Sequence, residues 1–97
     1  QEILNELRDL FLEHVPPLFS EIEEAAQSGD AESLATNIHS LKGACSTYGA
    51  PRLAMLCKQV EMLARDGNID SVQANFEVLR SEYEQVYDQI KGVGSEV

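Results

Sequence analysis

The spacing of apolar residues restricts the fold more than any other feature of this chain, because they recur every three or four positions along almost its whole length. The clearest run is Ile69, Val72, Phe76, Leu79, Tyr83, Val86 and Ile90. This spacing follows the 3.6-residue period of an α-helix and gathers the apolar side chains on one face. No stretch alternates apolar and polar residues as a half-buried strand would. We therefore expect an all-α fold.

Turn-forming residues divide this helical pattern into segments. Gly29-Asp30, Gly49 and Asp66-Gly67-Asn68 are typical of helix ends and turns. They predict helices at 31–47, from Pro51 up to Asp66, and at 69–90. Pro16 and Pro17 interrupt the first segment, because a proline lacks the amide hydrogen and crowds the carbonyl four residues back. We therefore expect a short helix near 2–14 and another near 16–28.

Short connections between amphipathic helices favour an antiparallel up-down-up-down four-helix bundle, here with a short extra N-terminal helix. A length of 97 residues with 43% hydrophobic content suits a single domain over residues 1–97. The chain begins with Gln rather than Met, which suggests a piece excised from a longer polypeptide or a processed chain.

Charge and cysteine usage narrow the environment. The formal net charge of −10 argues against nucleic acid and anionic membranes as partners, since both would repel the chain. Neither a run of about 18 apolar residues nor a signal-peptide pattern is present. We expect a cytoplasmic, monomeric domain without membrane contact. Cys45 and Cys57 lack metal-ligand spacing and fall on or beside apolar stripes, so reduced core thiols are expected, while a disulfide between them stays open.

The two histidines, His14 and His39, have different surroundings. His14 lies beside the proline pair, where we expect a packed or half-exposed side chain without a chemical role. His39 lies about 100° around its helix from Ile38, which belongs to the apolar stripe. The imidazole of His39 is therefore expected beside the stripe but outside it.

Most residues one or two turns from His39 are small, which leaves the imidazole uncovered. A glycine inside a helix costs about 1 kcal/mol relative to alanine, so Gly43 suggests that another molecule approaches the backbone closely there. Lys42 is the one long neighbour. A neutral imidazole is a nucleophile near pH 7, and a phosphorylated one carries roughly two negative charges that a lysine one turn away stabilises. The combination suits a phosphoryl carrier.

A carrier imidazole needs an acceptor at its second ring nitrogen to fix the tautomer, and Glu61 is the candidate. His39 lies ten residues before Gly49, and Glu61 lies eleven residues after Ala50. At about 1.5 Å per residue, both lie roughly 15 Å from the turn on antiparallel helices. Glu61 follows Val60 and so also flanks an apolar stripe. The helical wheel leaves open whether the two flanks face each other.

The residues around and after His39 form one motif, which reads His39-Ser40-Leu41-Lys42-Gly43-Ala44, then Gly49-Ala50, then Leu53, Cys57 and Glu61. This motif resembles that of histidine-containing phosphotransfer (HPt) domains, in which a histidine precedes Leu-Lys-Gly, a glycine about ten residues on and a leucine four residues later. The resemblance implies a helical bundle that takes a phosphoryl group on the outer ring nitrogen of His39. It further implies that Lys42 steadies that group, that Gly43 admits a docking receiver domain, and that Glu61 binds the inner nitrogen.

The same resemblance implies a phosphorelay intermediate that accepts a phosphoryl group from a receiver aspartate and passes it to a response-regulator aspartate. Such a domain is not itself an enzyme, and nothing here resembles a nucleotide-binding loop. A hybrid sensor histidine kinase, anchored in the inner membrane, is the expected parent, and a free-standing protein stays open as the alternative. The receiver would supply Mg²⁺, so no metal site or other cofactor is expected in this chain. The expected partner-binding residues, besides Gly43, are Ala35, Thr36, Ser46 and Lys58.

Two other interpretations stay open. The 69–90 run would allow pairing with a partner or a second copy, which describes a four-helix interaction module without catalysis. A metal-binding bundle enzyme requires Glu-x-x-His pairs on several helices. The chain has two histidines, and neither stands in such a pair.

Overall fold

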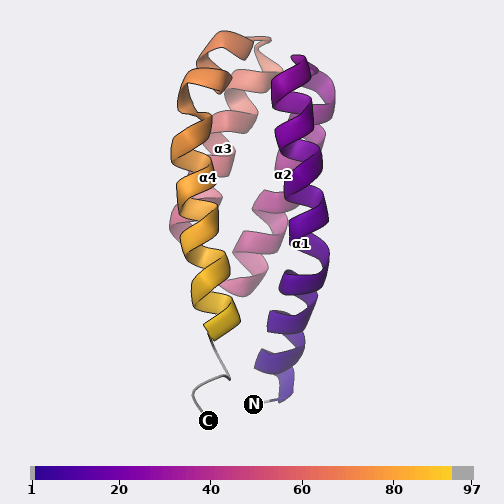
Figure 1. Cartoon of the computed structure of the whole chain (residues 1–97), viewed down its shortest axis with the longest axis vertical. Coiled ribbons are helices and arrows are strands. Elements are labelled where there is room, and N and C mark those ends of the chain that lie inside the picture. Colours follow the sequence, from indigo (N-terminus) through magenta and orange to yellow (C-terminus); the bar gives the residue numbers. More distant parts are fainter. Residues whose placement is uncertain (1, 93–97) are drawn as a thin grey trace.

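A computed structural model describes residues 2–92, with the side chains of Glu6 and of residues 8–92. These residues form four helices, α1 (Glu2–Ser28), α2 (Ala31–Tyr48), α3 (Pro51–Arg65) and α4 (Ile69–Gly92). Figure 1 shows the helices side by side in one bundle, with the start of α1 and the end of α4 at the end that also holds the α2–α3 turn. The predicted all-α bundle is confirmed. The outer limits of the predicted domain, residue 1 and residues 93–97, lie outside the described residues.

The short extra helix predicted at the N-terminus is wrong, because α1 continues through Pro16 and Pro17 (Figure 1). A proline inside a helix costs about 3 kcal/mol. The side chains of Phe11, Val15 and Phe19 lie on both sides of the prolines, share one face and are all buried. Burial of each such side chain contributes roughly 1.5–3 kcal/mol. The continuous buried stripe therefore outweighs the lost hydrogen bonds, and the helix persists.

The turn residues expected from the sequence do end the helices. Gly49 adopts a φ of 94°, a left-handed conformation that glycine takes without steric cost, and its amide donates to the Cys45 carbonyl. At the other end of α2, the Asp30 side chain accepts a hydrogen bond of 3.1 Å from the Ser33 amide. The short connection after Gly49 makes α2 and α3 an antiparallel hairpin, so residues equally far from the turn lie at one height.

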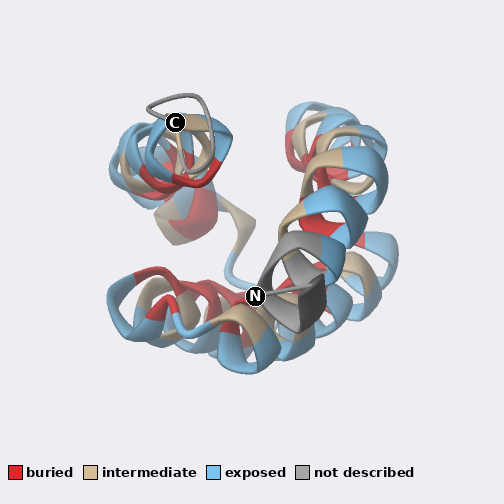
Figure 2. Cartoon of the chain, turned by 90° about the horizontal axis from the view of Figure 1, so that it is seen from below, coloured by how far each residue is buried: buried red, intermediate tan, exposed pale blue. Residues whose placement is uncertain are grey.

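The apolar face of α4 is used inside the bundle. Its buried residues are Val72, Phe76, Leu79, Tyr83, Val86 and Ile90. The Phe19 ring of α1 stacks on the Tyr83 ring with centroids 4.1 Å apart. Figure 2 shows the buried residues of the helices facing the middle of the bundle. Because its own core covers this seam, α4 does not offer it to a partner, which removes the motive for the interaction-module interpretation.

The two cysteines lie in the interior. Cys45 and Cys57 are free thiols with no exposed surface, as expected from their place on the apolar stripes. A hydrogen bond with Cys45, followed by burial, raises the pKa of the Cys57 thiol far above its ordinary value. Both thiols are therefore core residues, and the raised pKa of Cys57 disfavours its reactive thiolate form. Over residues 2–92, no helix is long and apolar enough to cross a bilayer.

Candidate functional site

His39 projects from the outer side of α2. Its side chain is 61% exposed, whereas the neighbouring Ile38 has no exposed surface. The helical phase explains this contrast, because successive residues point about 100° apart. The ring is therefore open to an approaching protein, as the sequence analysis expected.

Glu61 reaches this ring from α3. Its Oε2 lies 3.0 Å from Nδ1 of His39, so the α2–α3 packing does bring together the two flanks that the helical wheel left open. The glutamate itself is buried, with 6% of its surface exposed. The other ring nitrogen, Nε2, lies on the opposite side of the imidazole from this carboxylate. The ring thus has one occupied and one outward nitrogen.

Two cations share the Glu61 carboxylate with His39. Nζ of Lys42 donates to Oε1 at 3.0 Å. Arg65 donates to Oε2 through Nε at 2.9 Å and through Nη2 at 2.7 Å. We call His39, Lys42, Glu61 and Arg65 the His39 cluster. In this cluster, both carboxylate oxygens are held by side chains from two helices.

The charge state of Glu61 follows from these contacts. Burial by itself raises the pKa of its carboxyl. The hydrogen bonds from Arg65, Lys42 and His39 have the larger combined effect, and they lower this pKa from an ordinary 4.5 to about 2. Near neutral pH the carboxylate is ionised and can only accept hydrogen bonds. Nδ1 of His39 therefore donates its proton to Oε2. In the neutral ring, this tautomer leaves the lone pair on Nε2.

Several residues beside His39 on α2 are small. Gly43, one turn along α2, is exposed, and a Cβ built there would meet no heavy atom within 4 Å. Nothing inside the bundle therefore requires a glycine at this position. Thr36 and Ser46 are also exposed on α2, whereas Ala35 is buried with 4% exposure and offers a partner almost no area.

Several hollows border α2, and two of them contain exposed apolar or cationic side chains. The first, of about 240 Å³, lies between α1 and α2 and is lined by Leu10, Phe11, His14, Val15, Ala44, Thr47 and Tyr48. His14 is exposed at this hollow, and Leu10 is 52% exposed. The second is a shallow groove between α2 and α3, lined in part by Lys42, Ser46, Met55 and Lys58. Exposed apolar surface and cationic side chains therefore lie close to the His39 cluster.

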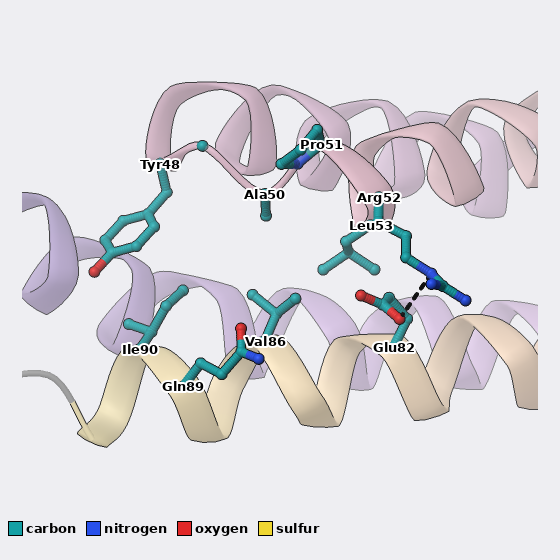
Figure 3. Close-up of a pocket in the computed structure, with 10 residues that line it drawn as sticks. Tyr48, Ala50, Pro51, Arg52, Leu53, Glu82, Val86, Gln89 and Ile90 are labelled. Atoms are coloured by element: carbon teal, nitrogen blue, oxygen red, sulfur yellow. Dashed lines mark ion pairs between the residues drawn. The ribbon is translucent and has the colours of Figure 1, made fainter.

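A further hollow lies at the end of the bundle that holds the α2–α3 turn (Figure 3). Tyr48, Leu53, Val86 and Ile90 line it, and a rim ion pair joins Nε of Arg52 to Oε1 of Glu82 at 3.3 Å. No member of the His39 cluster contributes to its wall. This hollow is therefore separate from the site around His39.

Charge is distributed unevenly over the bundle. Residues 31–65, which form the α2–α3 hairpin, hold four of the 7 basic residues of the chain but only two of its 17 acidic ones. The basic residues are Lys42, Arg52, Lys58 and Arg65. The hairpin that carries His39 is thus weakly cationic although the chain has a net charge of −10. Such a local field favours the approach of an anionic partner surface.

In the described part of the chain, no group of three or more His, Cys, Asp or Glu side chains is placed to hold a metal ion. The carboxylate nearest to His39 is already saturated by cations. The chemistry available at the cluster is that of an imidazole oriented by a carboxylate that two cations hold.

Comparison with known families agrees with this chemistry. The family model of the Hpt domain matches residues 6–89. The chain belongs to the Hpt domain family. As an Hpt domain, it is a phosphocarrier module that functions in histidine phosphotransfer within a phosphorelay, and domains of this family exchange phosphoryl groups with receiver domains.

Curated relatives of this Hpt domain are much longer proteins. The signal transduction histidine-protein kinase BarA of Shigella flexneri is 26% identical over 95 residues, which are 98% of this chain and 10% of that kinase. The sensor protein TorS of Escherichia coli strain K12 is 38% identical over 60 residues, which are 62% of this chain and 7% of TorS. The chain therefore spans a tenth or less of these relatives. No solved structure matches it significantly.

Arg65 is the member of the His39 cluster that was not predicted from the sequence. Arg65 follows Glu61 by four residues, the spacing at which helical side chains meet, so the signal was available. The sequence alone did not show that Arg65 would bind the same oxygen as His39. The sequence predicted no partner-contact residue on the first helix. In the structure, Leu10 and His14 of α1 border the hollow beside α2.

Proposed function

We propose that this Hpt domain accepts a phosphoryl group from a receiver aspartate on Nε2 of His39 and passes it to a response-regulator aspartate. The observation that carries the proposal is the hydrogen bond between Nδ1 of His39 and the ionised Glu61 carboxylate. This bond fixes the tautomer in which the outward nitrogen holds a free lone pair. The exposure of the ring supplies the access that a protein partner needs.

The transfer step balances without any further reactant. The Nε2 lone pair forms a bond to phosphorus while the bond from phosphorus to the aspartyl oxygen breaks, and the aspartate leaves as a carboxylate. Nδ1 keeps its proton, so the ring gains positive charge as the new bond forms. The Glu61 carboxylate, 3.0 Å from Nδ1, offsets that charge. The return of the phosphoryl group to a second aspartate is the same step reversed.

Lys42 is proposed to steady the phosphoryl group. Its Nζ donates a hydrogen bond to Oε1 of Glu61, and its backbone is one helical turn from that of His39. A change of rotamer therefore brings the ammonium group toward a phosphoryl group on Nε2. A compact cation on a flexible stem suits this task. The Mg²⁺ ion needed for the reaction at the aspartate is assigned to the receiver partner.

The proposed docking surface is the outer side of α2 around His39. Gly43 lets the receiver backbone approach closely, with Thr36 and Ser46 beside it as small polar contacts. The exposed Leu10 at the α1–α2 hollow adds apolar area. Lys58, exposed at the α2–α3 groove, adds positive charge toward an acidic receiver pocket.

Within a larger signalling system, we propose that this domain works in the cytoplasm as the carrier module of a sensor kinase. The names of the relatives, a signal transduction histidine-protein kinase and a sensor protein, support this setting. The burial of the α4 seam supports a monomeric carrier that meets its receivers one at a time.

Phosphoryl transfer from a phosphorylated receiver tests the proposed function. The recipients are the wild-type domain, His39→Gln and, as a matched control, His14→Gln. An acid-labile, base-stable label is expected on the wild type and on His14→Gln, but not on His39→Gln. Label that persists in His39→Gln, or that is lost in His14→Gln instead, contradicts the assignment of His39.

A further inference from the structure

We propose that Arg65 is a positioning residue for phosphoryl transfer, because it holds the Glu61 oxygen that selects the reactive tautomer of His39. The inference rests on the proposed function of His39. Arg65 acts through Glu61 and need not touch the phosphoryl group. Nothing in the sequence motif around His39 pointed to it.

Arg65 and His39 bind the same oxygen of Glu61. Nε and Nη2 of Arg65 both donate to Oε2 of Glu61, at 2.9 and 2.7 Å. Oε2 is also the atom that accepts the Nδ1 proton of His39. Lys42 holds the opposite oxygen, Oε1. A glutamate side chain has three rotatable bonds, and these contacts together prevent the carboxylate from turning away from the ring.

Charge gives Arg65 a second effect on the same atom. Glu61 is buried, and an ionised carboxylate in the interior is stable only with charged or hydrogen-bonding partners. Arg65 is one of the two cations that keep it ionised, and so keep Oε2 a pure acceptor. Without Arg65, the hydrogen bond from Nδ1 of His39 to Oε2 competes with hydration of a less well-compensated carboxylate.

The simplest competing explanation is an ordinary helical ion pair. Exposed pairs four residues apart contribute only about 0.3–0.5 kcal/mol, and the Arg65 side chain is 58% exposed. The acceptor distinguishes this pair from others in the bundle. Arg80 also pairs along its own helix with Glu77, but that glutamate is 78% exposed. The Arg65 pair ends on a buried oxygen shared with His39.

Arg52 provides a matched control. It is also on α3, and its side chain is 77% exposed. It pairs with Glu82 of α4 next to the α2–α3 turn, at the opposite end of α3 from Arg65. Arg52→Ala therefore changes the net charge of the same helix by the same amount as Arg65→Ala. It leaves the His39 cluster intact. Arg65→Lys keeps the charge but loses the two-pronged contact with Oε2.

The experiment combines a ring measurement with a kinetic one on the four proteins, wild type, Arg65→Ala, Arg65→Lys and Arg52→Ala. Nitrogen-15 NMR of the His39 ring reports the tautomer without any phosphoryl donor. Transfer from a phosphorylated receiver, measured at several receiver concentrations, separates the maximal rate from half-saturation. Circular dichroism confirms that each variant is folded, which the exposure of both arginines favours.

The wild-type ring and the Arg52→Ala ring are expected to carry the proton on Nδ1, with full transfer rates. In Arg65→Ala, both tautomers should be populated, and the maximal rate should fall about tenfold with half-saturation unchanged. Arg65→Lys should lie between them. This split is expected because a positioning residue alters the reactive ring and not the affinity for the receiver.

Two results overturn the proposal. If Arg65→Ala leaves both the tautomer and the maximal rate at wild-type values, Arg65 is only a helical ion pair. If its effect falls on half-saturation alone, Arg65 contacts the receiver instead. Failure of the proposed function looks different, because the wild type would then take no label on His39 while the NMR measurement would still decide the role of Arg65.

Discussion

Oε2 of Glu61 lies 3.0 Å from Nδ1 of His39, across the contact between α2 and α3 and 22 positions along the chain. The contact makes the orientation of an exposed ring depend on a buried residue of the neighbouring helix. The interior of the hairpin therefore controls which ring nitrogen faces the partner. A carrier that must meet receivers in solution gains a reactive group that is open yet oriented.

Substitution of Glu61 should affect transfer according to whether an acceptor is kept. Glu61→Gln retains a carbonyl oxygen for the Nδ1 proton, so we expect a loss of only a few-fold in maximal transfer rate. Glu61→Ala removes the acceptor, and we expect a loss of roughly tenfold or more. Transfer assays on both variants check this order. Equal rates for Glu61→Ala and the wild type would show that the contact has no part in the reaction.

The depressed pKa of Glu61 predicts a specific dependence of stability on pH. The carboxyl has a pKa of about 2 in the folded domain and an ordinary value of 4.5. A pKa that is lower in the folded state stabilises this state at pH values above the pKa of the unfolded chain. This contribution disappears as the pH falls from 4.5 toward 2. Its size is at most about 3 kcal/mol, from about 1.4 kcal/mol per pKa unit, and screening by solvent lowers it.

Chemical unfolding of the wild type and of Glu61→Gln at pH 6, 4 and 2.5 measures that contribution. The difference in unfolding free energy between the two proteins should be largest at pH 6 and should shrink as the pH falls. Other carboxyl groups cancel in the comparison because both proteins carry them. A difference that stays constant with pH would contradict the charge network around Glu61.

Gly43 should tolerate a methyl group but not a long side chain. A Cβ at this position meets no atom within 4 Å, so Gly43→Ala should fold and gain up to about 1 kcal/mol from its better helix propensity. Gly43→Arg should also fold, yet slow transfer about tenfold by holding the receiver away from His39. Thermal unfolding and transfer rates on the pair separate stability from docking. Equal transfer by Gly43→Arg and the wild type would remove the docking role of this glycine.

Lys58 should act through long-range attraction. Lys58→Glu is expected to lower the second-order transfer rate constant roughly three- to tenfold at low salt, with a weaker dependence on ionic strength. Lys91→Glu makes the same charge change on α4 and serves as the control, for which we expect little effect. Stopped-flow rates from 20 to 500 mM salt test the comparison. Wild-type rates and salt dependence for Lys58→Glu would exclude a steering role.

Much of the fold could be predicted because its determinants are local. Gly49 and Asp30 mark helix ends through backbone conformation and capping, which short sequence patterns express well. Counting residues from the α2–α3 turn was enough to place His39 and Glu61 at one height. Their hydrogen bond also requires a particular rotation of each helix, which tertiary packing decides.

The predictions from sequence were wrong or incomplete where tertiary contacts compete with local rules for helix formation. Pro16 and Pro17 predicted a break, but the buried stripe that includes Val15 and Phe19 holds α1 together. Ala35 was expected beside His39 on the surface, whereas the α2–α3 packing buries it. The role of Arg65 could not be predicted, because helical spacing indicates which side chains are neighbours and not which oxygen a guanidinium will bind.

Mapping of the phosphoryl group on the phosphorylated domain by ³¹P and ¹⁵N NMR tests the central claim most directly. We predict phosphorus bonded to Nε2 of His39, with Nδ1 still protonated and facing Glu61. A phosphoryl group on Nδ1 of His39, on His14 or on any other side chain would contradict the account.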